Sequence, residues 1–442
     1  MSSLGRELPK ELAVALDPDS AELVVSFRPS HFVRVGAPLP FRVPSSPSEL
    51  TAAMMTDVLR FRNYLGPRGR VASVMLKPIG EGAGAFGELC LVEMVLEGAL
   101  PGAPTSFVAK FSPKDVPIHL RSFTRSQFLR EAHFYNDFSI AGGGLPRPHC
   151  YLVAQSSPAS SSSRFVMLIE RATAEVAYTR ISGCDDAGRL KLLMAAVGSF
   201  HAKWWEHGRK PPLEWVQPMG SPDSKLWRAA YGFAWKRMAS LAVWDEVYAP
   251  IVGWRAAARR HVRALVAALH APPTTLCHLD LHLDNVFFGS QYPGGVAFID
   301  FANMALAPPM RDVAFFLGIN LDVPVRRALD ADLVRVYHDA LLAGGVRDYP
   351  FERCWRDYRL QLWYVLFVHV LCAVVTPGFA KQKRTRTGIY APDERLTKAD
   401  RTAAATFAAV NRRLVGALVD HRCDELLAQV ADEASDGCCG CA

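Results

Sequence analysis

The hydrophobic pattern of this chain changes once along its length, from strand-like to helix-like, near Glu170–Thr173. Before that point, short runs rich in Val, Leu and Phe are separated by Gly and Pro, and three such runs between residues 71 and 111 predict consecutive antiparallel strands. After it, apolar residues recur at spacings of three and four, as in Leu190, Leu193 and Val197, and predict long helices. A strand-rich part followed by a helix-rich part indicates an α+β protein of two lobes.

The 442 residues divide into four expected segments. They are a proline-containing N-terminal extension (1–48), a small N-lobe with an antiparallel sheet (49–170), a larger helical C-lobe (171–425) and a Cys-rich tail (426–442). Within the N-lobe, apolar spacing predicts helices over Glu49–Phe61 and Thr124–Phe138, and Thr124 and Gln127 have the spacing of a capping box at the start of the second.

Composition narrows the classes of partner. The chain has 50 basic and 43 acidic residues, a net charge of +7, and its Lys and Arg residues are scattered. Such an excess suits the binding of a polyanion such as ATP, or is simply an ordinary solvated surface. The sequence lacks a basic stripe interleaved with aromatic residues, so nucleic acid is a weak hypothesis. Residues 1–11 lack the apolar stretch of a secretory signal, and the longest apolar run, Leu362–Val375, is too short to span a bilayer. We therefore expect a cytoplasmic protein without a transmembrane segment.

The cysteines predict free thiols in a reducing compartment. Seven of the ten are isolated in the sequence: Cys90, Cys150, Cys184, Cys277, Cys354, Cys372 and Cys423. The other three, Cys438, Cys439 and Cys441, lie in the terminal string D-G-C-C-G-C-A. Cys439 has the position that prenylation requires, but Gly440 and Cys441 fit the aliphatic positions poorly. Lipidation or metal binding of the tail is therefore a weaker hypothesis than a frayed, unmodified end.

The most informative segment is H-L-D-L-H-L-D-N-V-F-F-G at residues 278–289, followed by V-A-F-I-D-F at 296–301. Phosphoryl transfer needs a carboxylate that orients the acceptor hydroxyl and oxygen ligands that hold magnesium against the phosphates. Asp280 fits the first role, and Asn285 and Asp300 fit the second. Each of them alone is more simply a turn or cap residue, and His278 or His282 a satisfied core histidine, but the ordered combination is hard to obtain by chance.

A glycine cluster precedes this segment in the N-lobe, with Gly80, Gly82, Gly84 and Gly87 in G-E-G-A-G-A-F-G. The same G-x-G-x-x-G spacing marks dinucleotide-binding proteins, where the glycines open a helix. The residues that follow Gly87 have a strand pattern instead, which favours a loop that covers the phosphates of a nucleotide.

Lys110 and Glu131 form a candidate phosphate-binding pair. Lys110 lies near the end of a predicted strand, S-F-V-A-K-F, and Glu131 lies on the predicted helix that follows. A lysine in a cleft neutralises the α- and β-phosphates when a glutamate holds it in place. On their own, a surface lysine and a solvated glutamate would be the simpler interpretation.

These motifs together resemble the aminoglycoside phosphotransferase and choline kinase group, and particularly its ecdysteroid-kinase-like (CHK kinase-like) branch. The matching segments are the glycine loop at 80–87, V-A-K at Lys110, R-E-A-H-F-Y around Glu131, F-H-A-K-W-W around His201, H-x-D-x-x-x-x-N at 278–285, I-D-F at Asp300 and R-D-V-A-F-F-L around Asp312. They span residues 50 to 372, which is most of the chain.

The resemblance implies a protein-kinase-like fold with ATP and Mg²⁺ as cofactors. By it Asp280 is the catalytic base, Asn285 and Asp300 are magnesium ligands, and Lys110 with Glu131 positions the phosphates. It also places Glu170 and Arg171 where such kinases bind adenine, and it makes Asp312 a structural brace of the catalytic loop. One departure is Leu279, which stands where the family usually has glycine.

The expected activity is transfer of a γ-phosphoryl group to a hydroxyl of a small molecule, such as an amino alcohol, a steroid-like compound or an aminoglycoside-like compound. The main alternative is a catalytically inactive relative that binds nucleotide or acts as a scaffold. A nicotinamide-dependent oxidoreductase would require a helix directly after Gly87. Aromatic residues of the C-lobe, among them Trp204 and Trp363, could line an acceptor pocket, although such residues are more often core.

Overall fold

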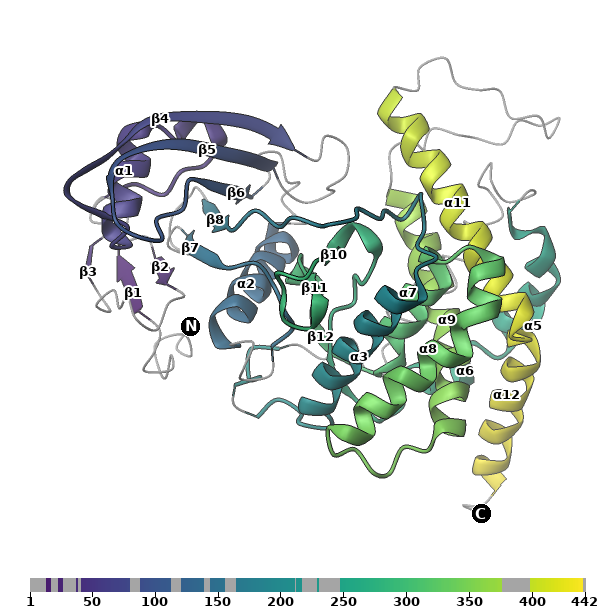
Figure 1. Cartoon of the computed structure of the whole chain (residues 1–442). Helices are drawn as coiled ribbons and strands as arrows, with labels where there is room; N and C mark the ends of the chain where they lie inside the picture. Colours follow the sequence, from purple (N-terminus) through teal and green to yellow (C-terminus); the bar gives the residue numbers. More distant parts are fainter. Residues whose placement is uncertain are drawn as a thin grey trace. The chain divides into compact units, whose positions relative to one another are not determined.

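The structure is a computed structural model of the whole chain. The residues it describes are 13–16, 23–26, 37–38, 41–79, 88–112, 121–138, 144–155, 164–210, 212–216, 229, 247–375 and 398–439. The chain divides into two compact units, residues 1–173 and 174–442, which we call the N-lobe and the C-lobe and describe separately (Figure 1).

The N-lobe is built on a sheet with the strand order β3-β1-β2-β7-β8-β6-β5-β4. Its main part consists of β4 (Leu65–Ile79), β5 (Glu88–Ala99), β6 (Ser106–Phe111), β7 (Cys150–Gln155) and β8 (Phe165–Ile169). Each neighbouring pair among these five strands is antiparallel, which confirms the predicted small antiparallel sheet. The segment predicted as an extension contributes β1 (Ala13–Leu16), β2 (Leu23–Ser26) and β3 (Ala37–Pro38) to the same sheet, because β2 pairs with β7.

The two faces of β6 show how the pleat divides core from site. Phe107, Ala109 and Phe111 alternate along the strand and are fully buried in a core shared with α1 (Ala52–Phe61). Lys110 lies between two of them and therefore points to the other face, since successive side chains of a strand point in opposite directions. The alternation of apolar residues in S-F-V-A-K-F thus sets the direction of the lysine.

Helix α2 (Arg121–Asp137) follows in the N-lobe and begins earlier than predicted. Its first residue precedes Thr124 by three positions, so the expected capping box at Thr124 and Gln127 is wrong. Gln127 is instead buried within the helix, beside Phe128. A capping-box spacing also arises by chance inside a helix.

The C-lobe combines two small hairpins with a set of packed helices. The strand β9 (Thr275–Cys277) pairs with β12 (Ala305–Ala307), and β10 (Val286–Phe288) pairs with β11 (Val296–Phe298). The longer helices are α3 (Ala187–Lys203), α7 (Met310–Asn320), α8 (Val323–Ala343), α9 (Phe351–Val375), α11 (Lys398–Asp420) and α12 (Cys423–Cys439). The antiparallel sheet of the N-lobe and the helices of the C-lobe together confirm the predicted two-lobed, kinase-like α+β fold.

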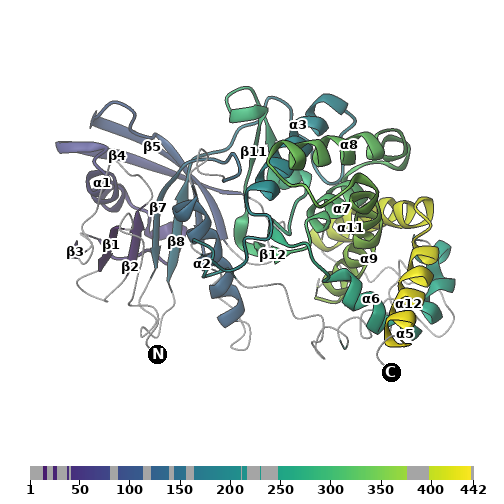
Figure 2. The same ribbon diagram turned by 90° about the horizontal axis from the view of Figure 1, so that it is seen from below.

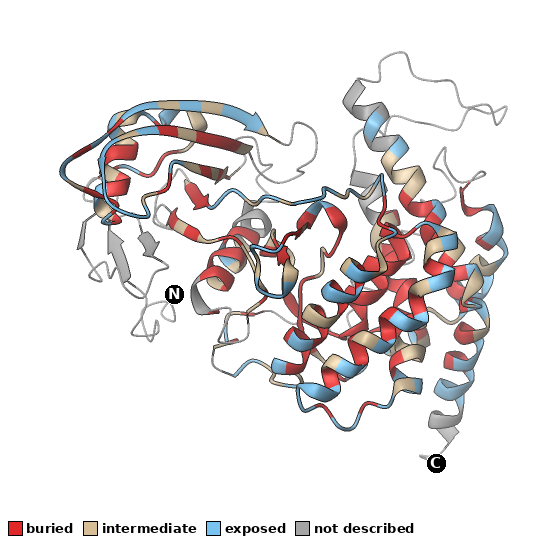
Figure 3. Ribbon diagram, in the orientation of Figure 1, coloured by how far each residue is buried: buried red, intermediate tan, exposed pale blue. Residues whose placement is uncertain are grey.

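The core of the C-lobe centres on α7, every residue of which is buried (Figure 3). Helix α3 crosses α8 closely at Gly198, where a Cβ atom would lie 2.5 Å from the carbonyl oxygen of Tyr337. Only glycine allows that approach. Trp363 and Trp204 are also core residues rather than an acceptor pocket, since both are buried and the Trp363 Nε1–H donates to the carbonyl oxygen of Cys423 at 2.9 Å.

The segment expected as a tail is largely ordered helix, because α12 continues to Cys439 and packs against α6 (Val262–Leu269) and α9 (Figure 2). Leu426, Leu427 and Val430 are buried there, at the spacing of one helix face. The side chains of Cys438, Cys439 and Cys441 lie outside the described residues. Six of the seven isolated cysteines are buried free thiols, and Cys372 lies outside the described side chains. Among the described helices, none has the length and apolarity that a membrane span requires.

Candidate active site

The catalytic-type motif forms the loop that joins β9 to β10, at residues 278–285. Its first half is held by Asp312 of α7, whose carboxylate accepts the backbone N–H of His278 at 2.6 Å and that of Leu279 at 2.8 Å. His201 of α3 approaches the same carboxylate through Nε2 at 3.2 Å, and its Nδ1 lies 2.8 Å from the Tyr337 hydroxyl. Asp312 therefore joins two helices to the loop.

The charge state of Asp312 suits this role. Its side chain is 1% exposed, and burial by itself would raise the pKa of the carboxyl group. The hydrogen bond from His201 and the positive ends of the donors around it outweigh burial and hold the pKa below its ordinary value. A buried carboxylate that accepts several hydrogen bonds stays ionised and holds its donors firmly.

The backbone conformation of Leu279 explains why the family usually has glycine at this position. Its φ is +62°, in the left-handed region that costs an ordinary L-residue about 1–2 kcal/mol. The bond from its N–H to Asp312 keeps the backbone in that conformation. The departure seen in the sequence therefore adds backbone strain to the loop.

Asp280, Asn285 and Asp300 come together within the C-lobe through the pairing of β10 with β11. The backbone N–H of Ile299 donates to the carbonyl oxygen of Asn285 at 3.0 Å, so Asp300 follows directly beside Asn285. The side chain of Asn285 turns back and donates from Nδ2 to the carbonyl oxygen of Asp280 at 3.0 Å. Asp300 itself has φ +63°, which places it on a sharp turn before the short helix Phe301–Asn303.

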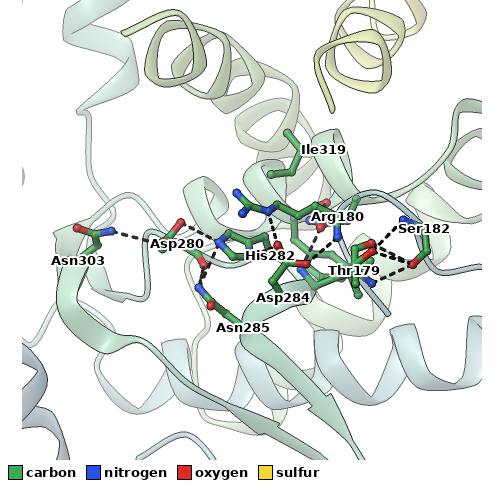
Figure 4. Close-up of polar contacts among 12 residues, drawn as sticks. Thr179, Arg180, Ser182, Asp280, His282, Asp284, Asn285, Asn303 and Ile319 are labelled. Atoms are coloured by element: carbon green, nitrogen blue, oxygen red, sulfur yellow. Dashed lines mark hydrogen bonds and ion pairs between the residues drawn. The ribbon is translucent and has the colours of Figure 1, made fainter. Parts of the chain in front are cut away.

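The carboxylate of Asp280 is flanked by two side chains (Figure 4). His282 Nε2 lies 3.4 Å from Oδ1, and the Nδ2 amide of Asn303 donates to Oδ2 at 3.3 Å. Burial favours a raised pKa at Asp280, but His282, with the further charges of His278 and Arg180, lowers the pKa to about 2. The group is thus an anion at neutral pH, as an acceptor of hydrogen bonds from a hydroxyl must be.

Arg180 extends this arrangement on the side of Asp284. Its backbone N–H donates to Asp284 Oδ1 at 2.9 Å and its Nε to Oδ2 at 2.6 Å (Figure 4). Arg413 of α11 in turn holds the backbone at Arg180, because its guanidinium group donates to the carbonyl oxygens of Arg180 and Ile181. Sequence reasoning did not single out Arg180, Arg413 or Asn303, since none of them belongs to a recognisable motif.

Lys110 and Glu131 meet in the N-lobe. Lys110 Nζ lies 2.7 Å from Glu131 Oε2, and the two side chains are 13% and 1% exposed. The ring of Phe128, one turn before Glu131 on α2, lies 5.8 Å from the ammonium group. A pair this well covered holds the lysine in one direction, unlike the solvated surface pair that was the simpler interpretation.

The remaining predicted N-lobe residues are Glu170, Arg171 and the four glycines. Glu170 follows β8, donates its backbone N–H to the His149 carbonyl oxygen at 2.7 Å and accepts the His149 N–H on its side chain at 2.8 Å. Arg171 Nη1 lies 3.8 Å from Glu93. The glycines Gly80, Gly82, Gly84 and Gly87 lie outside the described residues, but β5 begins at Glu88. A strand directly after the glycine cluster excludes the helix that a dinucleotide-binding site requires.

The donors in the C-lobe fit a magnesium ion. Because Nδ2 of Asn285 is bound to the Asp280 carbonyl oxygen, its amide oxygen is the atom that could bind an ion, and Asp300 follows Ile299, whose N–H donates to the Asn285 carbonyl oxygen. Carboxylate and amide oxygens are the ligands that hard divalent cations prefer. Asn285 and Asp300 are thus the residues that would hold such an ion.

A small β-rich N-lobe, a helical C-lobe and a loop of this composition between β9 and β10 define a kinase-like phosphotransferase fold. Residues 102–355 match the model of the phosphotransferase enzyme family (APH), and the chain belongs to this family. The match confirms the predicted family and the predicted class of enzyme. A search of curated proteins gave no match.

Solved structures with a similar fold include three small-molecule kinases or their relatives. A choline kinase from Cryptosporidium parvum Iowa II is 12% identical, with 80% of this chain and 94% of that chain covered and a TM-score of 0.48. An amicoumacin kinase in complex with AMP-PNP, Ca²⁺ and Ami is 11% identical, with 79% and 89% covered and a TM-score of 0.45. A choline/ethanolamine kinase family protein from Mesorhizobium loti is 14% identical, with 81% and 95% covered and a TM-score of 0.41.

Proposed function

We propose that this phosphotransferase moves the γ-phosphoryl group of ATP onto a hydroxyl group of a small molecule in a magnesium-dependent reaction. The observation that carries the proposal is that Asn285 Nδ2 donates to the Asp280 carbonyl oxygen and that the N–H of Ile299, the residue before Asp300, donates to the Asn285 carbonyl oxygen. The three side chains are the base and the two ligands that phosphoryl transfer requires, in the order that the kinase-like fold uses.

In the proposed mechanism, Asp280 accepts a hydrogen bond from the acceptor hydroxyl and aligns its oxygen with the γ-phosphorus. The hydroxyl proton passes to the Asp280 carboxylate as the new P–O bond forms and the bond to the β-phosphate oxygen breaks. Asn285 and Asp300 would hold magnesium, which supplies charge neutralisation at the phosphates when bound.

The N-lobe residues have proposed roles in nucleotide binding. Lys110 neutralises the α- and β-phosphates, and Glu131 keeps its ammonium group in position. The glycines at 80, 82, 84 and 87 cover the phosphates, and Glu170 and Arg171 lie by the adenine. Since the N–H of Glu170 is donated to His149, a contact with adenine would use the carbonyl oxygen of Glu170.

The acceptor is proposed to be an amino alcohol, a steroid-like alcohol or an aminoglycoside-like compound. Membership of the phosphotransferase family and the names of the similar structures, which include a choline kinase and an amicoumacin kinase, suggest this range. The narrower CHK kinase-like branch stays a prediction, as do the four segment boundaries.

A thermal-shift titration with ATP, with and without Mg²⁺, tests the nucleotide site. Ligand at a hundred times its Kd stabilises a folded protein by about 2.7 kcal/mol, which is several degrees of Tm. We expect Mg-ATP to raise the Tm of the wild type and to raise that of Asp300→Ala much less. NAD(P) alone should leave the Tm unchanged. The absence of any shift with ATP would favour the alternative of an inactive scaffold that does not bind nucleotide.

Turnover is then measured as ADP release with a panel of small alcohols. Asp280→Ala should lower kcat by about 10²–10⁴-fold, the usual effect of losing a general base, while Mg-ATP still stabilises the protein. Asp339→Asn, which changes an exposed aspartate on α8, is the matched control and should behave as wild type. Normal turnover in Asp280→Ala would refute the assignment of the base.

A further inference from the structure

The Asp280 carboxylate has a separate partner for each of its two oxygens. Asn303 Nδ2 donates to Oδ2 at 3.3 Å, and His282 Nε2 lies 3.4 Å from Oδ1. Figure 4 shows the two side chains on opposite sides of the carboxylate. The family motif contains His282 only as one of its variable letters, and Asn303 lies 23 residues from Asp280 in the sequence.

Asn303 is held in place by the backbone around it. It ends the short helix Phe301–Asn303, which follows the left-handed Asp300, and the next residue donates its N–H to the Phe301 carbonyl oxygen at 3.3 Å. The strand β12 then starts at Ala305, which is in register with Cys277 at the end of β9. The turn that carries Asn303 is therefore attached to the strand that leads into the catalytic loop.

His282 is held in place by burial and by its polar neighbours. The side chain is 8% exposed, and the Nδ1 atom lies 4.0 Å from a carboxylate oxygen of Asp284. Asp284 is in turn fixed by two hydrogen bonds from Arg180, whose backbone is clamped by Arg413. The imidazole thus lies between the carboxylates of Asp280 and Asp284, and its Nε2 also lies 3.3 Å from Nδ2 of Asn285.

A carboxylate needs such support to act as a base in one geometry. The torsion that turns the carboxylate plane of an aspartate is broad, so the side chain alone does not fix where its lone pairs point. Displacement of a reacting group by about 1 Å is enough to slow an enzyme by about 10²-fold. A donor on each oxygen removes that freedom before the acceptor binds.

We propose that Asn303 and His282 are positioning residues that fix the plane of the Asp280 carboxylate for the acceptor hydroxyl. The inference rests on the proposed role of Asp280 as the base. It adds Asn303, which contacts Asp280, and His282, whose Nε2 lies near Asp280 and also 3.3 Å from Nδ2 of Asn285.

Substitutions of matched shape test each side of the carboxylate. Asn303→Asp keeps the shape of the side chain but replaces the donor with a second carboxylate, and we expect kcat to fall by about 10–100-fold with little change in the KM for ATP. His282→Leu should have a similar effect. His282→Gln, which keeps an N–H near the position of Nε2, should recover most of the rate.

A double-mutant comparison separates positioning from a general structural role. Turnover is followed as ADP release from Mg-ATP, with water and with the alcohol identified in the screen, in wild type, Asn303→Ala, Asp280→Ala and the double variant. We expect Asn303→Ala to slow the wild type and to have no further effect once Asp280 is alanine. The control Gln291→Ala removes an exposed amide of the C-lobe and should leave turnover unchanged.

The outcomes distinguish this inference from the proposed function. If Asp280→Ala is inactive but Asn303→Asp and His282→Leu turn over like wild type, the positioning role is wrong and the proposed base stands. Equal losses from Asn303→Ala in both backgrounds would also overturn it, because they would show an effect that does not pass through Asp280. If Asp280→Ala itself keeps full turnover, the proposed base is wrong, and the positioning role is refuted with it.

Discussion

Replacing Asp312 with alanine should both destabilise the C-lobe and slow turnover. The side chain is 1% exposed and accepts the backbone N–H groups of His278 and Leu279, with His201 Nε2 as a third neighbour. A buried donor left without its acceptor costs about 1–3 kcal/mol. With three donors affected and some relaxation of the loop, we expect the free energy of unfolding to fall by about 3–5 kcal/mol.

The same substitution removes the contact that keeps Leu279 at φ +62°. Without it, the backbone gains about 1–2 kcal/mol by leaving the left-handed region, and the next residue, Asp280, moves with it. We therefore expect kcat to fall by at least about 10²-fold, because Asp280, the proposed base, is displaced from its working position. The affinity for ATP without magnesium should change much less, since Lys110 and Glu131 belong to the other lobe.

Equilibrium urea unfolding, followed by tryptophan fluorescence, measures the first effect, and ADP release measures the second. Asp312→Asn keeps one acceptor oxygen and should lose roughly half as much stability as Asp312→Ala. The exposed control Asp339→Asn should stay within about 0.5 kcal/mol of wild type. A loss below about 1 kcal/mol in Asp312→Ala, or a stability loss with full kcat, would refute the bracing role.

Three further predictions concern strain, ion pairing and pH. Leu279→Gly should be more stable than Leu279→Ala in urea unfolding, because alanine keeps the cost of the positive φ that glycine escapes; the reverse order would show that the site is not strained. Glu131→Gln should cost about 3 kcal/mol of unfolding free energy and weaken Mg-ATP binding, because it leaves the Lys110 ammonium group without its carboxylate; unchanged stability would contradict the coverage of the pair. Burial and the charge of Arg311 lower the pKa of His270 to about 4, so the unfolded chain binds more protons below pH 6.5 and stability falls as the pH drops. Between about pH 7 and pH 5 the wild type should lose about 2 kcal/mol more than His270→Asn, and parallel pH curves would disprove the shift.

The two lobes were predictable because their signals are local. Strand alternation in S-F-V-A-K-F and helical spacing from Leu190 to Val197 report which residues face the core, and the structure has β6 and α3 there. Boundaries were less predictable. Helix α2 begins before its apparent capping box, and α12 continues through the expected tail, because packing against α6 and α9 stabilises it.

By itself, the sequence determined the set of candidate groups, since the proposed base, the two proposed oxygen ligands and the lysine–glutamate pair can be selected by residue type, order and spacing. The tertiary structure alone decided what surrounds them. Asp312 reaches His278 across 34 residues and Asn303 reaches Asp280 across 23, and neither distance leaves a periodic signal in the sequence. Such contacts arise when strand pairing, as between β9 and β12, and helix packing bring remote segments together, so the support of Asp280 is a property of the folded chain.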